Sequence, residues 1–486
     1  MLRNDNQIKL SEYNGLYEKI IPKNNILLKI KENIDFSFVN PMLKKSYCEH
    51  FGRPAKEPEM MFKLLFLKKL YDLSDEELIQ NSCVNMSYKY FLDLAPDEEM
   101  IDSSLLTKFR KTRITEDILE EMLRETISQA IKKGLVKSTA IIVDATHTKA
   151  NAKVESPTEI LRKLTKELRK KIYQEQFDLS EKFPDKPVET ADLTEEIKYS
   201  KQLIKNIECE ILQNKNPKLV KLFIKIKSLL ECDRIREIRS NADIEARFGH
   251  KSESQSFFGY KTHIAITEER LISGIKVTTG EASDGGMLKE LVNRSQENGV
   301  EIREVIGDRA YSWDENINYC DENNVILISR LNPVIATASA PKNDGFIYNK
   351  DANTMQCPGG CLAMRYDKRT GKYQNTFMTF NFSKKKCRIC PQCLNCKVGQ
   401  SKTKTYTITL LRDKHKERLD FEKSDYFKQR MRHRYKIEAK NSELKHAHGL
   451  NRSESVGLEA MRLQSYLSAF VVNIKRIVKL NDLVTG

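Results

Sequence analysis

Glu438 lies between two cationic residues on one face of a predicted helix near the C-terminus. Because each residue of a helix turns the chain by about 100°, Arg434 lies one turn before Glu438 and Lys445 two turns after it. Glu443 points roughly 140° away and belongs to another face. A carboxylate flanked by two cations suits a surface where a metal-binding acid meets a phosphate backbone. The alternative is a solvated helix with spaced ion pairs, and partner carboxylates elsewhere in the chain would decide between the two.

Two aspartates follow short apolar runs that have the composition of buried strands. Asp144 follows the run 138–143 (STAIIV), and Asp308 follows the run 304–307 (EVIG). Acids at the carboxyl ends of strands commonly build the sites of α/β proteins. Taken singly, such an acid often caps the following turn. Taken together with Glu438, the two aspartates predict a site made of three carboxylates.

The chain is strongly basic. Its 83 Lys and Arg exceed its 68 Asp and Glu, for a formal net charge of +15, which predicts a polyanionic partner, most simply nucleic acid. Between residues 401 and 486, 19 Lys and Arg stand against 10 acids, so more than half of the excess lies around Glu438. The N-terminus lacks the apolar stretch of a signal peptide, and no stretch is long enough to span a membrane. We therefore expect a cytoplasmic protein without membrane contact, whose cysteines are reduced.

Six of the 11 cysteines crowd into one short segment, in the pattern Cys-x3-Cys followed by Cys-x2-Cys-x2-Cys-x2-Cys. This spacing predicts a structural zinc site that uses a subset of the six. An iron–sulfur cluster and unmetallated thiols are the alternatives, although the proline that follows the last cysteine of ferredoxin motifs is missing. The adjacent run 384–386 of three lysines suggests a contact with DNA or a solvated turn. The candidate ligands are Cys357, Cys361, Cys387, Cys390, Cys393 and Cys396.

Short helices are expected before the first aspartate. Residues 56–73 are apolar at helical spacing, and Ser74 begins the next helix with a capping-box pattern. A longer helix is expected over 115–134. Short helices with a basic tip suit a DNA-binding head over 1–115, and the alternative is a helical region that only packs or oligomerises.

The segment 153–239 is highly charged and carries three apolar stripes at helical spacing. This pattern predicts an inserted helical hairpin or three-helix arm. A DNA clamp, a dimer contact and a solvated spacer all fit such an arm, and the sequence does not choose between them.

Strand signals return after this insertion. Two apolar runs separated by a short turn predict an antiparallel hairpin, and the run before Asp308 predicts a further strand. The expected elements are the hairpin strands 257–266 and 271–278, helices near 286–298 and 313–323, a strand at 325–329, and a long apolar helix over 456–480.

This order of elements resembles that of the ribonuclease-H-like nucleotidyltransferases, in which strands bearing two acids enclose a hairpin and a late helix bears a glutamate. The local motifs resemble the DDE transposases of bacterial insertion sequences, in the IS-four/IS-five-like superfamily. Asp144 in the segment VDATHTK and Asp308 in the segment GDRAY resemble the first and second acids of that family. The segment 258–263 (FGYKTH) is similar to the second-strand motif. The resemblance covers about residues 45–145 and 240–480.

The late helix matches the family motif Tyr-x2-Arg-x3-Glu-x6-Lys at three of its four positions, Arg434, Glu438 and Lys445. Met431 stands where the family has tyrosine. That tyrosine is credited with helping to hold DNA, so the departure concerns how DNA ends are handled. Tyr435 could substitute, but it lies on another face of the helix.

The resemblance implies two-metal cleavage and rejoining of DNA by in-line attack on a phosphodiester. Mg²⁺ or Mn²⁺ would activate the attacking oxygen and stabilise the leaving one. Asp144 is assigned as the bridging ligand, while Asp308 and Glu438 would each complete the shell of one metal ion.

Neighbouring residues receive lesser roles. Arg434 and Lys445 would bind phosphates beside the metal ions, and Lys436, one face over, is a weaker candidate. His147 is expected to be a half-buried residue near the end of its strand rather than a group that reaches the phosphate. Asp284 is expected to cap the next helix.

The predicted fold class is α/β, with a ribonuclease-H-like mixed-sheet catalytic core, an N-terminal helical domain, a helical insertion and a Cys-rich insertion. The expected regions are the N-terminal helical domain 1–115, the core 138–152 and 240–332, the charged helical insertion 153–239, the Cys-rich insertion 333–410, and the C-terminal part of the core 411–486.

The resemblance implies a transposase that cleaves DNA and transfers strands at the terminal inverted repeats of an insertion sequence. Its partners would be double-stranded DNA and a second copy of the chain, since two element ends are processed together. One alternative is a catalytically idle, transposase-derived DNA-binding protein, against which the intact acid triad argues. Another is a ribonuclease-H-like nuclease that cuts DNA without joining a 3′-hydroxyl end to target DNA.

Overall fold

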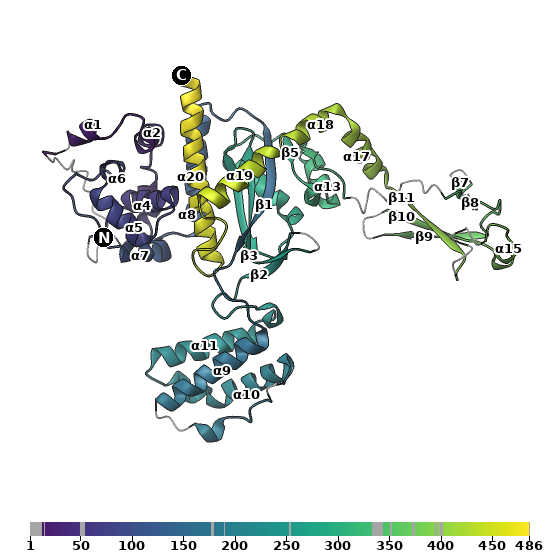
Figure 1. The fold of residues 1–486 in the computed structure, drawn as a ribbon, viewed down its shortest axis with the longest axis horizontal. Coiled ribbons are helices and arrows are strands. Elements are labelled where there is room, and N and C mark those ends of the chain that lie inside the picture. Colours follow the sequence, from purple (N-terminus) through teal and green to yellow (C-terminus); the bar gives the residue numbers. More distant parts are fainter. Residues whose placement is uncertain are drawn as a thin grey trace.

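A mixed β-sheet lies in the middle of the molecule, with other groups of elements attached around it (Figure 1). Helix α20 (Leu458–Thr485) runs between the N-terminal helices and the sheet and contacts both. The computed structural model describes residues 12–13, 15–48, 54–175, 179–188, 190–251, 254–332, 344–349, 352–371, 375–393, 396, 398 and 402–485.

The central sheet has the strand order β2–β3–β1–β5–β6, with β4 also paired to β3. β1 runs antiparallel to β3 and parallel to β5, and β5 runs parallel to β6. The expected hairpin forms from β3 and β4, whereas β2 has no counterpart among the sequence-based expectations. The strands are β1 (Ala140–Lys149), β2 (Arg247–His250), β3 (Ser256–Thr267), β4 (Ile272–Thr279), β5 (Glu304–Ile306) and β6 (Ile326–Ile328).

Strand β1 is longer than the sequence predicts. Its apolar run 141–143 is completely buried, as expected of a strand with neighbours on both sides. The strand then continues to Lys149, because residues 144–149 keep pairing with β3. Gly259 permits this close pairing, since a Cβ there would lie 2.0 Å from the carbonyl oxygen of Thr148. Asp144 therefore lies inside β1, and the end of the apolar run is not the end of the strand.

The N-terminal helices share one continuous apolar core with the sheet. The capping box at Ser74 is confirmed, since its hydroxyl accepts from the N–H of Glu77 and the Glu77 side chain accepts from the N–H of Ser74. Thr115 caps the longest of these helices, and Gly134, at a φ of +66°, follows its end. The helices are α1 (Leu16–Ile20), α2 (Ile26–Asn33), α3 (Val39–Lys44), α4 (Pro58–Tyr71), α5 (Asp75–Val84), α6 (Met86–Phe91), α7 (Ser104–Arg113) and α8 (Glu116–Lys132).

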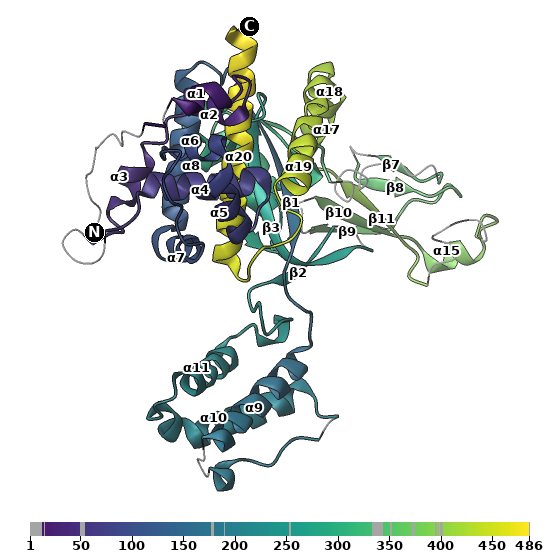
Figure 2. The same ribbon diagram turned by 60° about the vertical axis from the view of Figure 1, so that its left-hand side comes forward.

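Three helices form where the charged insertion carries its three apolar stripes: α9 (Pro157–Gln174), α10 (Leu193–Leu212) and α11 (Pro217–Glu231). Their apolar faces meet in a core of their own, separate from that of the sheet. Figures 1 and 2 both show this bundle apart from the sheet, near β2.

The Cys-rich region, which we call the Cys-rich module (residues 344–411), contains small antiparallel sheets. Its own apolar core includes Met355, Met378 and Phe380, against which several cysteines pack. Its elements are β7 (Ile347–Asn349), β8 (Thr354–Gln356), β9 (Arg365–Thr370), β10 (Thr376–Asn381), α15 (Lys384–Arg388) and β11 (Thr405–Leu410).

The remaining helices surround the sheet. Helices α8, α12 and α20 contact strand β4, α13 contacts β6, and α19 contacts β1. Within the described ranges, no helix combines the length and the apolar character that crossing a bilayer requires. These helices are α12 (Leu288–Glu297), α13 (Asp314–Glu322), α17 (Asp413–Lys423), α18 (Asp425–Arg432) and α19 (Tyr435–Ala447).

Candidate active site

Asp144 and Asp308 come together because their strands are adjacent and parallel. In the pairing of β1 with β5, Ile142 stands opposite Ile306, and each aspartate follows two residues later. Neighbouring strands lie about 5 Å apart, and a step of two residues returns the side chain to the same side of the sheet. Strand register thus places the two carboxylates next to each other.

Both carboxyl groups have a raised pKa. Burial raises the pKa of Asp144 to about 6, and the charges of Asp308 and Asp284 act in the same direction, while the N–H of Ala145 and the charge of Arg434 oppose them. Burial also raises the pKa of Asp308, again against the charge of Arg434. Like charges held close together disfavour ionisation, and a nearby cation restores it. The pair therefore favours a compensating positive charge.

Glu438 lies on the face of α19 that meets the aspartates, although its side chain is 62% exposed. On the same face, one turn later, Asn441 donates from Nδ2 to Oδ2 of Asp144 at 2.9 Å. The Oε1 atom of Glu438 lies 3.6 Å from Nη2 of Arg434. The structure thus brings Asp144 and Asp308 together and places Glu438 beside them on a separate element.

Arg434 supplies the positive charge of this region. It immediately precedes the first residue of α19 and has helical backbone angles, so it keeps the predicted position relative to Glu438. Its charge lowers the pKa of both Asp144 and Asp308, and its Nε atom is buried without a hydrogen-bond partner among the described residues. The guanidinium therefore stands close to three carboxylates at once.

Lys445 lies further along the same helix, beside β1. Its Nζ is 3.4 Å from Nδ1 of His147. Burial and the charge of Lys251 lower the pKa of Lys445 to about 8, against the charge of Asp144. Burial and Lys445 lower the pKa of His147 to about 4, so this imidazole is neutral at pH 7. The His147 ring packs against Phe257 and is half-buried, in line with its expected place.

Lys436 and Met431 lie away from the aspartates. The Nζ of Lys436 is 3.7 Å from Oε1 of Glu268, on another face of α19. Met431 is partly buried and packs against the main apolar core. Tyr435 is 55% exposed, with the guanidinium of Arg270 5.5 Å from its ring centre. At position 431, where the resembling family has tyrosine, this chain therefore has a methionine that packs against the apolar core.

Glu443 anchors the helix that carries Glu438. Oε2 of Glu443 accepts from Nζ of the almost completely buried Lys440 at 2.9 Å, and its Oε1 accepts from Nζ of Lys475 on α20 at 3.3 Å. Lys475 also lies 3.2 Å from Nε2 of His448. Glu443 does point to another face, as its spacing predicts, and there it joins α19 to α20.

Two further residues of this region, Asn441 and Asp284, were not assigned to the site from the sequence. Asn441 belongs to no motif, and its separation of one helical turn from Glu438 is the signal that could have found it. Asp284 makes no side-chain capping bond to the helical turn that follows it. Instead, it pairs with Nζ of Lys261 at 2.8 Å, and its charge raises the pKa of both Asp144 and Asp308.

The donor atoms of this region suit a hard divalent cation. Within the part of the chain that the structure describes, no group of three or more His, Cys, Asp or Glu side chains is arranged to hold a metal ion. Beside the two aspartates, however, Oδ1 of Asn441 and Oγ1 of Thr146 are buried oxygens without a hydrogen-bond partner among the described residues. Buried oxygen atoms normally have partners, and carboxylate, amide and water oxygens are what Mg²⁺ prefers.

The two groups of cysteines meet around one glycine of the Cys-rich module. All six cysteines are half-buried. The N–H of Cys361 donates to Sγ of Cys357 at 3.3 Å. A Cβ on Gly359 would lie 2.9 Å from Sγ of Cys390 and 3.8 Å from Sγ of Cys357, so segments about 30 residues apart in sequence converge here.

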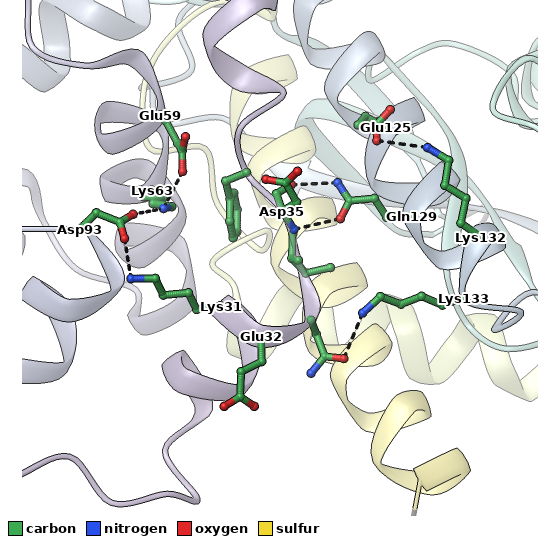
Figure 3. Close-up of a pocket in the computed structure, with 13 residues that line it drawn as sticks. Lys31, Glu32, Asp35, Glu59, Lys63, Asp93, Glu125, Gln129, Lys132 and Lys133 are labelled. Atoms are coloured by element: carbon green, nitrogen blue, oxygen red, sulfur yellow. Dashed lines mark hydrogen bonds and ion pairs between the residues drawn. The ribbon is translucent and has the colours of Figure 1, made fainter. Parts of the chain in front are cut away.

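A hollow of about 620 Å³ opens in the N-terminal part of the chain, between α2, α4 and α8 (Figure 3). Lys63 of α4 pairs there with Glu59 at 2.7 Å and also with Asp93, which in turn pairs with Lys31 of α2. These charges compensate one another. Asp144, Asp308 and Glu438, which we call the acid cluster, are not among the residues that line the hollow.

Two protein families match this chain. A family described as a transposase domain (DUF772) matches residues 16–112, and a family described as a transposase DDE domain matches residues 236–474. A protein of Rhizobium meliloti described as "Uncharacterized protein ORF8 in nfe locus" is 35% identical over 88 residues, which are 18% of this chain. The chain spans 42% of the length of this relative. No solved structure matches. The two matched domains, together with the acid cluster, support the assignment of this chain to the DDE transposases.

Proposed function

We propose that this chain is the transposase of a bacterial insertion sequence, which cleaves DNA and transfers strands at the terminal inverted repeats of its element. The observation that carries the proposal is the meeting of Asp144 and Asp308 on adjacent parallel strands beside the helix of Glu438. Its supporting context is the pair of matched transposase domains. The motif spacing Arg434, Glu438 and Lys445 favours the IS-four/IS-five-like superfamily.

The sheet is of the kind that a ribonuclease-H-like core requires. Strand β3 pairs antiparallel with both β4 and β1, and β5 and β6 continue the sheet parallel to β1. The two acids lie on the inner strand β1 and directly after its neighbour β5. This topology supports a ribonuclease-H-like core.

Asp144, Asp308 and Glu438 would hold the divalent ions, with Asp144 as the shared ligand. When bound, Mg²⁺ or Mn²⁺ supplies activation of the attacking oxygen and stabilisation of the leaving oxygen. Asn441 orients the carboxylate of Asp144 through its Nδ2 hydrogen bond. Since ligand carboxylates must be ionised, the raised pKa of Asp144 makes metal binding favour higher pH.

Arg434 has two successive tasks in this proposal. In the free protein its charge favours the ionised forms of Asp144 and Asp308. When DNA and metal ions arrive, the same guanidinium is close enough to the carboxylates to bind a phosphate beside them, as Arg does well. Lys445, with its pKa of about 8, adds a second phosphate contact near His147. Lys436 faces Glu268, so its contribution to DNA binding would be smaller.

We further propose that a subset of the six cysteines binds structural Zn²⁺, because two cysteine pairs of zinc-ligand spacing converge around Gly359. Metal analysis of the purified protein tests this directly. One equivalent of zinc is expected, and finding neither zinc nor iron would remove the site.

The proposal also implies partners. Double-stranded DNA at the element ends and at the target would be bound by a homodimer in the cytoplasm, because two ends must be processed together. Size measurement of the complex formed with DNA fragments that carry one end each checks the dimer. Two chains with two fragments are expected, and one chain on one fragment would contradict the dimer.

The acids are tested by cleavage of DNA that carries the inverted repeats. Asp144→Ala, Asp308→Ala and Glu438→Ala should each abolish Mg²⁺- or Mn²⁺-dependent cleavage while DNA binding persists. Asp425→Ala, at an almost completely exposed carboxylate of α18, is the matched control and should cleave normally. Full cleavage by Asp308→Ala would overturn the assignment.

A pre-cut end distinguishes the proposal from its two alternatives. A transposase should join an element end with a free 3′-hydroxyl to target DNA, whereas a ribonuclease-H-like nuclease would only cut. An idle DNA-binding descendant would do neither, even with Mn²⁺ present.

A further inference from the structure

The Cys-rich module concentrates positive charge far more than the rest of the chain. Between residues 344 and 411 there are 12 Lys and Arg and three acids, Asp344, Asp351 and Asp367. This segment of 68 residues therefore has a net charge of +9, whereas the whole chain has +15. Such a density of one sign creates a strong local potential and attracts a polyanion.

The charge lies on the surface of the module. Three cations of β9, Arg365, Lys368 and Arg369, are exposed, and so are the cations of α15 (Lys384, Lys385, Lys386 and Arg388). None of these seven has an ion pair with a described residue, in contrast to the compensated lysines of the hollow between α2, α4 and α8. Unpaired cations at this density repel one another, and a bound polyanion would relieve that repulsion.

The three-stranded sheet β11–β10–β9 has two different faces. Along β10, Met378 and Phe380 point into the core of the module. The alternate residues Phe377, Thr379 and Asn381 form the other face, because successive side chains of a strand point to opposite sides. No core cluster of the described residues includes this second face.

Cross-strand pairing identifies the rows of this second face, which we call the polar face. Directly opposed residues of antiparallel strands point to the same side. Arg365 therefore stands in a row with Asn381 and Thr405, Asp367 with Thr379 and Thr407, and Arg369 with Phe377 and Thr409. The polar face thus presents two guanidinium groups, several hydroxyl groups and, in its middle row, the carboxylate of Asp367.

Hydrogen bonds and a ring contact join neighbouring side chains of the polar face. The hydroxyls of Thr379 and Thr407 lie 3.0 Å apart, Asn381 donates to Asp367 at 2.9 Å, and Arg369 lies 5.3 Å above the ring of Phe377. Guanidinium and hydroxyl groups are the usual ligands of DNA phosphates and carry no sequence information.

The module is fixed to the core and does not hang free. The fully buried His415 of α17 lies 2.7 Å from Oδ1 of Asp314 on α13 and 2.9 Å from Oδ1 of Asn375, just before β10. Arg412 also contacts both Asp314 and Asn375. Figure 1 shows β9, β10 and β11 on the side of the central sheet away from the N-terminal helices. A DNA duplex bound by the module would therefore lie apart from the N-terminal helices.

We propose that the polar face of the Cys-rich module binds the phosphate backbone of duplex DNA, independently of base sequence. The inference rests on the proposed function only in taking DNA as the polyanion. Exposed apolar residues nearby, Leu362, Met364 and Ile389, would suit a membrane surface instead, so anionic lipid serves as the competing ligand in the test.

The experiment measures the affinity of the full chain for a short DNA duplex of arbitrary sequence, at several salt concentrations and without divalent metal. The variant R365A/R369A should bind on the order of tenfold more weakly at physiological salt, and the slope of log K against log salt should fall by about two. R365K/R369K should restore the slope, because charge is kept. The matched control K416A/K423A removes the same charge from exposed positions of α17 and should leave the slope unchanged.

Three results would overturn the proposal. The first is an unchanged affinity and salt slope in R365A/R369A. The second is a failure of R365K/R369K to restore the affinity and slope although circular dichroism shows a native fold. The third is that the wild-type chain binds anionic vesicles or single-stranded RNA more tightly than duplex DNA. The variant Asp308→Ala distinguishes this DNA-binding proposal from the catalytic one. The variant should bind the duplex with normal affinity, whether or not it still cleaves DNA.

Discussion

On the central sheet, Asp144 and Asp308 are partly buried and are fixed by the parallel pairing of β1 with β5, whereas on helix α19 Glu438 is 62% exposed. Burial raises the pKa of both sheet acids, and the charge of Asp308 adds to the raised pKa of Asp144. The helix acid is oriented indirectly, through the ion pairs that hold α19 against α20.

This difference teaches how the proposed site is assembled. Half of it exists in the free protein, because strand register cannot change without unfolding the sheet. The other half depends on one exposed side chain and on Arg434, which lies among the carboxylates. We therefore expect substitutions on the sheet to affect both stability and chemistry, and a substitution at Glu438 to affect chemistry alone.

The largest effect is expected from the sheet. Asp308→Ala should reduce metal-dependent cleavage by at least about a thousandfold, because a ligand of the metal pair that stabilises the transition state is lost. It should also change the thermal stability of the metal-free chain, since Asp308 is partly buried and caps the turn after β5 through the N–H of Ala310. Cleavage kinetics and thermal unfolding measure the two effects, and normal cleavage would contradict the first.

A loss of similar size, but without a change in stability, is expected on the helix. Glu438→Ala should abolish cleavage while the melting temperature stays within about 1 °C of the wild type, because exposed side chains contribute little to stability. Glu438→Asp keeps the charge and should retain weak activity. A marked loss of stability in Glu438→Ala would show that the helix acid is structural, and would erase the contrast with the sheet.

A smaller effect is expected from the anchor of α19. Lys440→Ala leaves Glu443 paired with Lys475 and removes the nearly buried cation of an ion pair, which typically costs about 3 kcal/mol. Cleavage should fall through poorer placement of Glu438, with a higher Mg²⁺ requirement. Denaturant unfolding and a Mg²⁺ titration test this, and loss of stability without a change in Mg²⁺ requirement would mean that the anchor does not position the site.

The smallest effect concerns pH. The pKa of Asp144 in the folded chain is about 6, above its value of about 3.9 in unfolded chains, so the folded state holds the proton more tightly. Stability of the metal-free chain should therefore fall as pH rises from about 4 to about 6, by at most about 3 kcal/mol, and stay lower above that range.

Asp144→Asn removes this titration. The variant should be more stable than the wild type at pH 7 to 8 in the presence of a chelator, and its advantage should vanish near pH 4. Unfolding measured at several pH values checks this. A stability difference that does not change between pH 4 and pH 8 would mean that Asp144 ionises as it does in the unfolded chain.

Sequence patterns predicted the elements whose signal is local. The capping box at Ser74, the hairpin of β3 and β4 and the strand before Asp308 follow from hydrophobic spacing and turn residues alone. The neighbourhood of Asp144 and Asp308 could be anticipated because both follow buried apolar runs and because the order of elements resembles a known family.

Contacts between distant segments could not be predicted in this way. The extension of β1 to Lys149 depends on pairing with β3, more than 100 residues later. The pairing of Asp284 with Lys261, and the hydrogen bond from Asn441 to Asp144, depend on how strands and helices pack. The polar face of the Cys-rich module could not be predicted, because the register in which β9, β10 and β11 pair decides which of their threonines and arginines stand in one row.

The central claim is that acids from the sheet and from α19 form one metal site. Its most direct test is equilibrium Mn²⁺ binding by the chain in complex with a pre-cut DNA end, followed by electron paramagnetic resonance. Asp144→Asn and Glu438→Gln should both weaken Mn²⁺ binding by on the order of tenfold or more, and the control Asp425→Asn should not. If Glu438→Gln binds Mn²⁺ as tightly as the wild type, the helix acid is not a ligand and the site is not the one described.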